Sequence, residues 1–118
     1  MQPPHENTAL NFANLLIEER FSDAFALLSP ALQSNLGLFE LEKTYLNMIG
    51  YFKTPPNHIE IVEALSDWPG KLSDDVAWVY VSIDNGSSDA EAVSVTLESS
   101  SANAKNQVTI RNIEWGRP

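Results

Sequence analysis

The chain has no cysteine, few basic residues and no long apolar run. With no Cys among 118 residues, disulfides, a thiolate nucleophile and a Cys-ligated zinc site are excluded. The two histidines are too few for a His-rich metal site. No apolar stretch approaches the roughly 20 residues that cross a bilayer. Met1–Glu6 lacks the basic and apolar regions of a secretion signal, so we expect a cytoplasmic location.

Basic residues are outnumbered by acidic ones. Lys and Arg total 7 against 16 Asp and Glu, which gives a net charge of −9. Such a surface repels phosphate backbones and anionic lipids, so we expect neither nucleic acid nor a membrane as partner. A basic protein remains compatible with this charge. The hydrophobic share of 43% is enough for a folded core, and the length fits one domain over residues 1–118.

The spacing of apolar residues changes near residue 55, from a helical period to a period of two. Helices followed by strands favour an α+β fold over alternating βαβ units. The helical part is expected over about residues 5–54 and the strands over about 58–116. Four helical segments are expected, at about 5–20, 22–29, 30–36 and 38–53. Ser22 or Asp23 is the expected cap of the second.

Four strand candidates follow, at 58–68, 76–83, 90–97 and 107–115, with a polar loop at 98–106. Asp84-Asn85-Gly86 predicts a hairpin between the second and third. Alternation slips at Ile61-Val62, and parity changes within the last strand, so we expect bulges or bends in both. Helices packed on one face of such a curved antiparallel sheet would leave a cone, open at one end.

The segment Ala9–Pro30 carries a family resemblance. A long first helix, a polar break and then Ala-Phe-Ala-Leu-Leu-Ser at 24–29 resemble the opening of NTF2-like, cystatin-type α+β domains. The resemblance implies a conical cavity and frequent dimers through the sheet. The family includes isomerases, dehydratases, cyclases, transport-factor modules and immunity proteins, so the fold alone does not assign a function.

Candidate site residues fall into two groups, and neither forms a catalytic motif. The aromatic group suits core, interface or cavity lining, and the acidic group suits either a polar loop with turn-capping Asp or carboxylates of raised pKa. The ligand-pocket candidates are Tyr45, Asp67, Trp68, Asp74, Trp78, Tyr80 and Trp115. Asp74-Asp75 could also bind a hard cation, although no calcium-loop spacing is present.

Three further residues were considered for chemistry. Two of them, His58 and Arg111, have both a catalytic or binding interpretation and a purely structural one. His58 is a candidate base or a solvated strand-end histidine, and His5 lies in the N-terminal turn. Arg111 could hold a substrate carboxylate or pair with Glu91, Glu98 or Glu114 across the sheet. No phosphate-binding loop, dinucleotide glycine pattern, zinc helix or nucleophile elbow is present, so we predict no catalytic residue, metal or cofactor.

Two functional hypotheses follow. The first is a non-catalytic NTF2-like accessory or protein-interaction domain, homodimeric through the sheet, with an immunity protein that blocks a basic toxin as one version. The alternative is a domain that binds a small apolar ligand, or acts as an isomerase or cyclase, within the cone. The alternative requires Asp67, Asp74 or His58 to point inward beside Trp78 or Tyr80.

Overall fold

The computed structural model describes residues 4–99 and 108–116. Four helices come first: α1 Pro4–Ile17, α2 Phe21–Phe25, α3 Pro30–Leu36 and α4 Leu38–Met48. Four strands follow: β1 His58–Leu65, β2 Asp75–Asp84, β3 Ala90–Ser99 and β4 Val108–Trp115. The strands pair antiparallel in the order β1-β2-β3-β4. The predicted α+β class and the four-stranded sheet are therefore confirmed.

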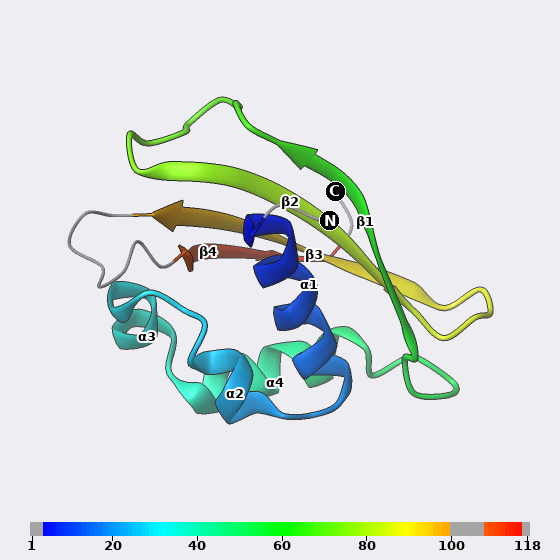
Figure 1. Ribbon diagram of the computed structural model, residues 1–118. Helices are drawn as coiled ribbons and strands as arrows, with labels where there is room; N and C mark the ends of the chain where they lie inside the picture. The colour runs from blue at the N-terminus through cyan, green and yellow to red at the C-terminus, as the bar shows by residue number, and fades with distance from the viewer. Residues whose placement is uncertain (1–3, 100–107, 117–118) are drawn as a thin grey trace.

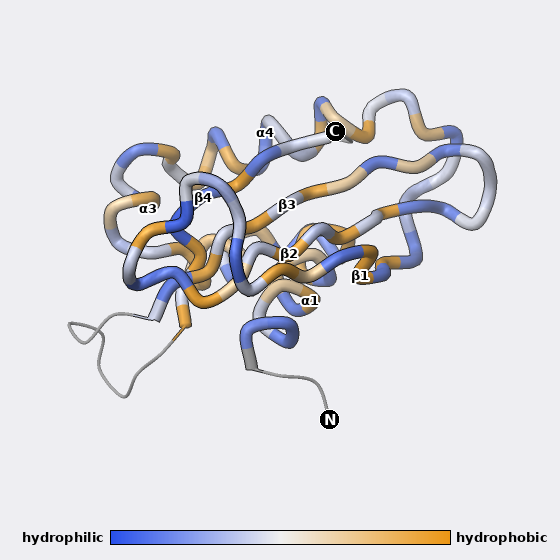
Figure 2. The backbone as a smooth tube through the Cα atoms, turned by 90° about the horizontal axis from the view of Figure 1, so that it is seen from above, coloured by the Kyte–Doolittle hydropathy of each residue, from blue (hydrophilic) through white to orange (hydrophobic). Residues whose placement is uncertain are grey.

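The helices lie on one face of the sheet, and the long strands curve over them (Figure 1). α1 contacts all four strands, while α2 and α4 pack together farther from the sheet. Along the strands the colour in Figure 2 alternates between apolar and polar positions. This alternation is clearest in β2, whose burial alternates residue by residue, because one face of the strand meets the core and the other does not.

The core forms between α1, α4 and the inner face of the sheet. On β2 and β3 the paired residues Val79 and Val95, and Val81 and Val93, are fully buried. α1 contributes residues at helical spacing, with Phe12 and Leu16 also fully buried. The other buried hydrophobic residues are Ala9, Ala13, Leu15, Phe21, Ala24, Leu28, Leu41, Tyr45, Ala77, Ile83, Ala92, Leu97 and Ile110.

The helix boundaries differ from those expected because backbone hydrogen bonds end the helices early. α1 stops at Ile17, where Arg20 N donates to Leu15 O and Glu19 N to Leu16 O. This is the Schellman ending, and it places Glu19 at φ 58°, a left-handed conformation that usually takes glycine. The N-cap of α2 is Arg20, without a side-chain cap bond, so the expected Ser22 or Asp23 cap is wrong.

Both predicted strand irregularities are present. The register of β1 against β2 shifts between Ile61 and Glu63, which leaves Val62 59% exposed. The register of β3 against β4 shifts opposite Thr96 and Leu97, so Arg111 has no direct partner. Of the expected loop 98–106, Glu98 and Ser99 belong to β3, while residues 100–106 and the expected strand start at Gln107 lie outside the described residues.

The linker between α2 and α3 covers part of the β4 edge. Ser29 N donates to Ile110 O at 2.8 Å, and Ile110 N donates to Leu27 O at 3.0 Å. Ser29 also caps α3, because its Oγ accepts a hydrogen bond from Leu32 N at 3.2 Å. These bonds join the helical layer to the last strand and satisfy backbone groups that an open sheet edge would expose.

Candidate functional site

The outer face of the sheet carries two of the predicted aromatic residues side by side. Trp78 and Tyr80 lie on the face of β2 opposite the helices, and both are partly exposed. Their ring centroids are 6.2 Å apart in an edge-to-face arrangement. Ser94 and Thr96, their partners on β3, are small and buried at 5% and 4% exposure. Because the β3 side chains are short, the two rings project above the neighbouring part of the outer face.

Acidic side chains surround this aromatic pair. Directly paired residues of an antiparallel sheet point to the same face, so Glu63, opposite Tyr80, shares the outer face. Glu60 lies opposite Ser82 and follows the same rule. On the other side Glu114 Oε1 accepts a hydrogen bond from Trp78 Nε1 at 3.3 Å. We call Glu60, Glu63, Glu114, Trp78 and Tyr80 the acidic aromatic face.

The three glutamates of the acidic aromatic face are exposed, and none forms an ion pair within the described part of the chain. The strands supply little positive charge to offset them. Within the described ranges of β1–β4, the basic side chains are Arg111 and His58. His58 Nδ1 lies 2.9 Å from Asp84 Oδ2, a hydrogen bond that raises the pKa of the exposed imidazole.

Arg111 pairs with Asp75, not with the glutamates expected. Its Nε donates to Asp75 Oδ1 at 2.6 Å and its terminal nitrogen to Asp75 Oδ2 at 2.7 Å. The Asp75 side chain is fully buried, and the guanidinium beside it holds the pKa of this carboxyl below its usual range. Both groups are committed to each other, so Arg111 has no role as a substrate clamp in this structure.

The loop between β1 and β2 keeps its acidic residues in solvent. Asp67 and Asp74 are both exposed, and Trp68 packs under the ammonium of Lys71, 5.7 Å from the ring centroid. Among the residues that the structure describes, no group of three or more His, Asp or Glu side chains could hold a metal ion.

The condition set for an isomerase-like site is not met. His58 is exposed at the start of β1, and like Asp67 and Asp74 it does not point inward beside Trp78 or Tyr80. Trp115 is also separate from those aromatics. It lies opposite Val93 at the end of β4 and packs against the core on the inner face. The seven predicted pocket residues are thus divided among the outer face, the β1–β2 loop and the inner side.

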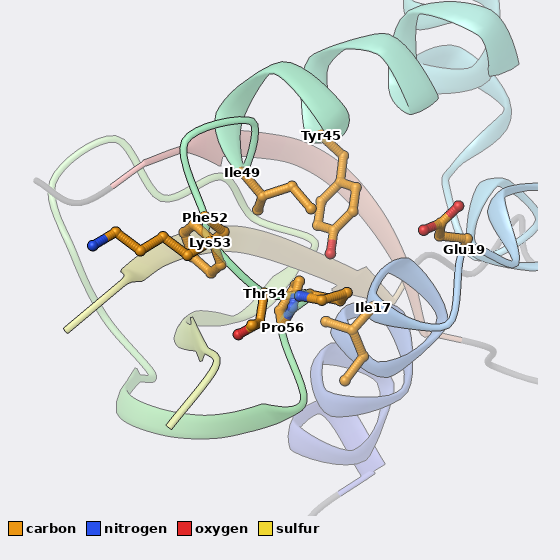
Figure 3. Close-up of a pocket in the computed structure, with 9 residues that line it drawn as sticks. Ile17, Glu19, Tyr45, Ile49, Phe52, Lys53, Thr54 and Pro56 are labelled. Carbon is orange, nitrogen blue, oxygen red and sulfur yellow. The ribbon is translucent and has the colours of Figure 1, made fainter. Parts of the chain in front are cut away.

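One of the predicted residues, Tyr45, lines a cavity in the described part of the structure. The cavity has a volume of about 220 Å³ and lies between the C-terminal ends of α1 and α4 and the segment that leads into β1 (Figure 3). Its lining consists of Ile17, Glu19, Tyr45, Ile49, Phe52, Lys53, Thr54, Pro55 and Pro56. The lining presents polar and carbon surface in about equal parts, and the two prolines have no backbone N–H to present to a ligand.

The hydroxyl of Tyr45 points toward the cavity in Figure 3 and has no hydrogen-bond partner among the residues that the structure describes. The residue is 0% exposed, and its ring packs on Phe21 at 5.8 Å between centroids. Burial raises the pKa of the phenol, and the negative charge of Glu19 raises it further, so the hydroxyl keeps its proton near neutral pH. Because the side chain is fully buried, this hydroxyl lies behind the accessible surface of the cavity.

The sequence pattern missed most of this cavity. Tyr45 was a candidate, but the apolar stripe that contains it also fits simple packing. Glu19 carries no motif, and its position at the rim depends on the left-handed turn that ends α1. Pro55-Pro56 carries no binding motif either, although Pro56 is buried and forms part of the wall.

A search of protein-family models, of curated proteins and of solved structures finds no match to this chain. No helix in the described ranges combines the length and apolar character needed to span a membrane. Function must therefore be inferred from the surfaces that the chain itself presents.

Proposed function

We propose that the chain is a non-catalytic protein-interaction domain whose acidic aromatic face binds a cationic surface of another protein. The observation that carries this proposal is the placement of Trp78 and Tyr80, partly exposed and in contact, among Glu60, Glu63 and Glu114, which form no ion pair within the described residues. Aromatic residues on an otherwise polar surface are typical of the centres of protein interfaces.

The chemistry of this face selects basic side chains. A guanidinium or ammonium group over an indole or phenol ring gains a cation–π interaction, and nearby carboxylates add charge-assisted hydrogen bonds. Arginine fits best, because its planar fork stacks on aromatic rings and also pairs with carboxylates through two hydrogen bonds. The net charge of −9 would also speed the approach of a positively charged partner at low salt.

The same charges disfavour the homodimer that the aromatic strands and the family resemblance led us to expect. Two copies meeting through this face would bring Glu60, Glu63 and Glu114 of each close to those of the other, with no lysine on the described strands to compensate. Like charges held together at an interface cost binding free energy. The homodimer stays a prediction, and we rank a basic partner ahead of it.

NTF2-like membership and the immunity-type role are part of this proposal. The order of helices before an antiparallel sheet, and the curvature of that sheet, support the former. An immunity protein acts by tight, charge-complementary binding to its toxin. An acidic face that covers a basic active surface would therefore support the immunity-type role. Neither feature requires chemistry from this chain, in line with the exposed positions of His58, Asp67 and Asp74.

A titration of the ¹⁵N-labelled chain with a nona-arginine peptide, followed by NMR, tests the proposal. We expect the largest shifts at the Trp78 indole N–H and along β1, β2 and β4. The double substitution E60K/E63K should weaken binding by about tenfold or more, because two carboxylates become repulsive charges. The matched control is E18K/E40K, which makes the same change in net charge at two exposed positions on the helical side.

The proposal is wrong if the control variant weakens binding as much as E60K/E63K does, because the peptide would then respond to net charge alone. Sedimentation equilibrium of the chain without peptide tests whether the chain instead forms a homodimer through this face. A stable dimer with a protected Trp78 indole would show that a second copy occupies this face, and it would replace the cationic partner by the homodimer.

A further inference from the structure

We infer that the free edge of β1 is the docking site for an extended, basic segment of another protein, which adds to the sheet as a further strand. This inference rests on the proposed function, because it specifies how the cationic partner is held beside the acidic aromatic face. The added strand pairs with His58–Ile61, the part of β1 that precedes its bulge. It places basic side chains on the outer face of the sheet and apolar side chains on the inner face.

The first argument is that the backbone of β1 is open on one side. β1 stands at the end of the sheet order, so β2 is its neighbour on one side and no strand lies on the other. Alternate residues of such an edge strand direct their N–H and C=O groups away from the neighbouring strand. Within the described residues, no backbone group outside β2 bonds to the backbone of His58–Leu65. Figure 1 shows β1 at the rim of the sheet, where another strand can pair with it.

The second argument comes from the opposite edge, where the sheet already accepts an added segment. Ile110 on β4 forms a parallel bridge with the linker between α2 and α3. In this bridge Ser29 N donates to Ile110 O, and Ile110 N donates to Leu27 O. The described part of the chain thus covers a stretch of the β4 edge and leaves the β1 edge open. The open edge is the one that carries Glu60 and Glu63 of the acidic aromatic face.

The third argument is that the two faces of β1 select different side chains in an added strand. On the outer face, Glu60 and Glu63 are exposed and form no ion pair within the described residues. On the inner face, Ile59 and Ile61 are only partly buried and pack at the margin of the core. Paired residues of adjacent strands share a face. A strand that alternates basic and apolar residues therefore brings its charges to the glutamates and covers the isoleucines.

The same features disfavour a second copy of this chain at the β1 edge. Bulges and charged side chains are devices that limit pairing between exposed edges. β1 has both, because Val62 is the extra residue of its bulge and lies between Glu60 and Glu63. A pair of β1 strands would bring like charges together, which costs binding free energy. A short basic strand meets attraction instead, and it needs only His58–Ile61 to pair.

The probe that tests the inference is a heptapeptide that alternates arginine and valine and begins and ends with arginine. It is compared with two isomers, one N-methylated on its three valines and the other on its last three arginines. An added strand bonds through alternate residues, so only one edge of the peptide pairs with β1. One isomer should therefore bind about tenfold or more weakly than the unmodified peptide, and the other should stay within about twofold of it.

Two NMR measurements on the peptide-saturated chain locate the added strand. Hydrogen exchange of the β1 amides that point away from β2 should slow by about tenfold or more, because these amides become hydrogen-bonded. Nuclear Overhauser effects should connect the valine methyl groups of the peptide with the methyl groups of Ile59 and Ile61. Effects that connect the valines with the Tyr80 ring instead would place them on the outer face and would contradict the inference.

The outcomes distinguish this inference from the proposed function. If both N-methylated isomers bind as tightly as the unmodified peptide, no strand is added, and the inference fails while the cationic partner stands. If neither the heptapeptide nor nona-arginine shifts the acidic aromatic face, the proposed function fails and the inference fails with it. If sedimentation equilibrium shows a dimer without peptide, and its outward β1 amides are already protected, a second copy occupies the edge and the basic segment is wrong.

Discussion

Arg111 holds Asp75 through two parallel hydrogen bonds of 2.6 and 2.7 Å, and so connects β4 to β2 across the intervening β3. Arg111 is the extra residue at the β3–β4 register shift, and Asp75 lies at the β2–β3 shift. Asp75 also accepts from Leu72 N at 2.8 Å, which orders the end of the β1–β2 loop. One ion pair thus links the two register shifts, one at the start of β2 and one within β4.

Replacing Asp75 with Asn should destabilise the fold by about 3 kcal/mol, the low end for breaking a buried pair, because Arg111 keeps 25% exposure. The Asn amide oxygen can still accept from Leu72 N, so the loss reports the ion pair itself. The measurement is urea unfolding at pH 7. Asp74→Asn, next to it but exposed, is the control and should change the unfolding free energy by less than about 0.5 kcal/mol.

The pH dependence of this loss has a definite sign. The folded pKa of Asp75 is lowered from an ordinary value of 3.8, chiefly by the hydrogen bonds from Arg111. Its contribution to stability is therefore complete above about pH 3.8 and is lost as pH falls through the lower folded pKa. The difference between the original chain and Asp75→Asn should shrink in that acidic range. A difference that stays constant down to pH 2 would contradict the ion-pair explanation.

Gly37 joins α3 to α4 with φ 77° and ψ 150°, a combination open almost only to glycine. Gly37→Ala should therefore destabilise the chain by about 1–3 kcal/mol, although the added Cβ would meet no atom within 4 Å. Thermal unfolding measures this. Gly50→Ala is the control, since Gly50 has no positive φ, and we expect it to stay within about 0.5 kcal/mol of the original chain. Equal losses in both would show that strain at Gly37 is not the cause.

His58 should titrate above its ordinary pKa because Asp84 accepts its hydrogen bond and carries the opposite charge. Asp84→Asn should lower the pKa of His58 toward 6.5, as followed by NMR of the imidazole protons. A raised folded pKa means that the pair stabilises the fold fully below the unfolded pKa, and that this stabilisation is lost as pH rises through the folded value. Asp67→Asn, in the exposed loop, should leave the titration unchanged.

The order of elements could be predicted from the sequence because it depends on local spacing. A period of two through residues 76–83 specified a strand with one buried face, and the structure buries Ala77, Val79, Val81 and Ile83 as expected. The slip at Ile61-Val62 marked the β1 bulge for the same reason. Helix ends were harder, because the Schellman bonds at the end of α1 involve backbone groups that no side-chain pattern records.

The candidate site depended far more on contacts between distant segments. Tyr45 is only an apolar-stripe residue until the end of α1 and the Pro55-Pro56 segment lie beside it. Trp115 was grouped with Trp78, yet the register shift at Arg111 places it on the core face. The choice of Asp75 as the partner of Arg111 likewise follows from two bulges acting together.

By itself the sequence determined the α+β class, the sheet irregularities and the negative charge, because periodicity and composition act within one segment. Only the tertiary structure decided which polar groups are paired, which are buried and which surround a cavity. Those properties depend on the relative placement of α1, α4 and the four strands, and that placement is set by packing of the whole core.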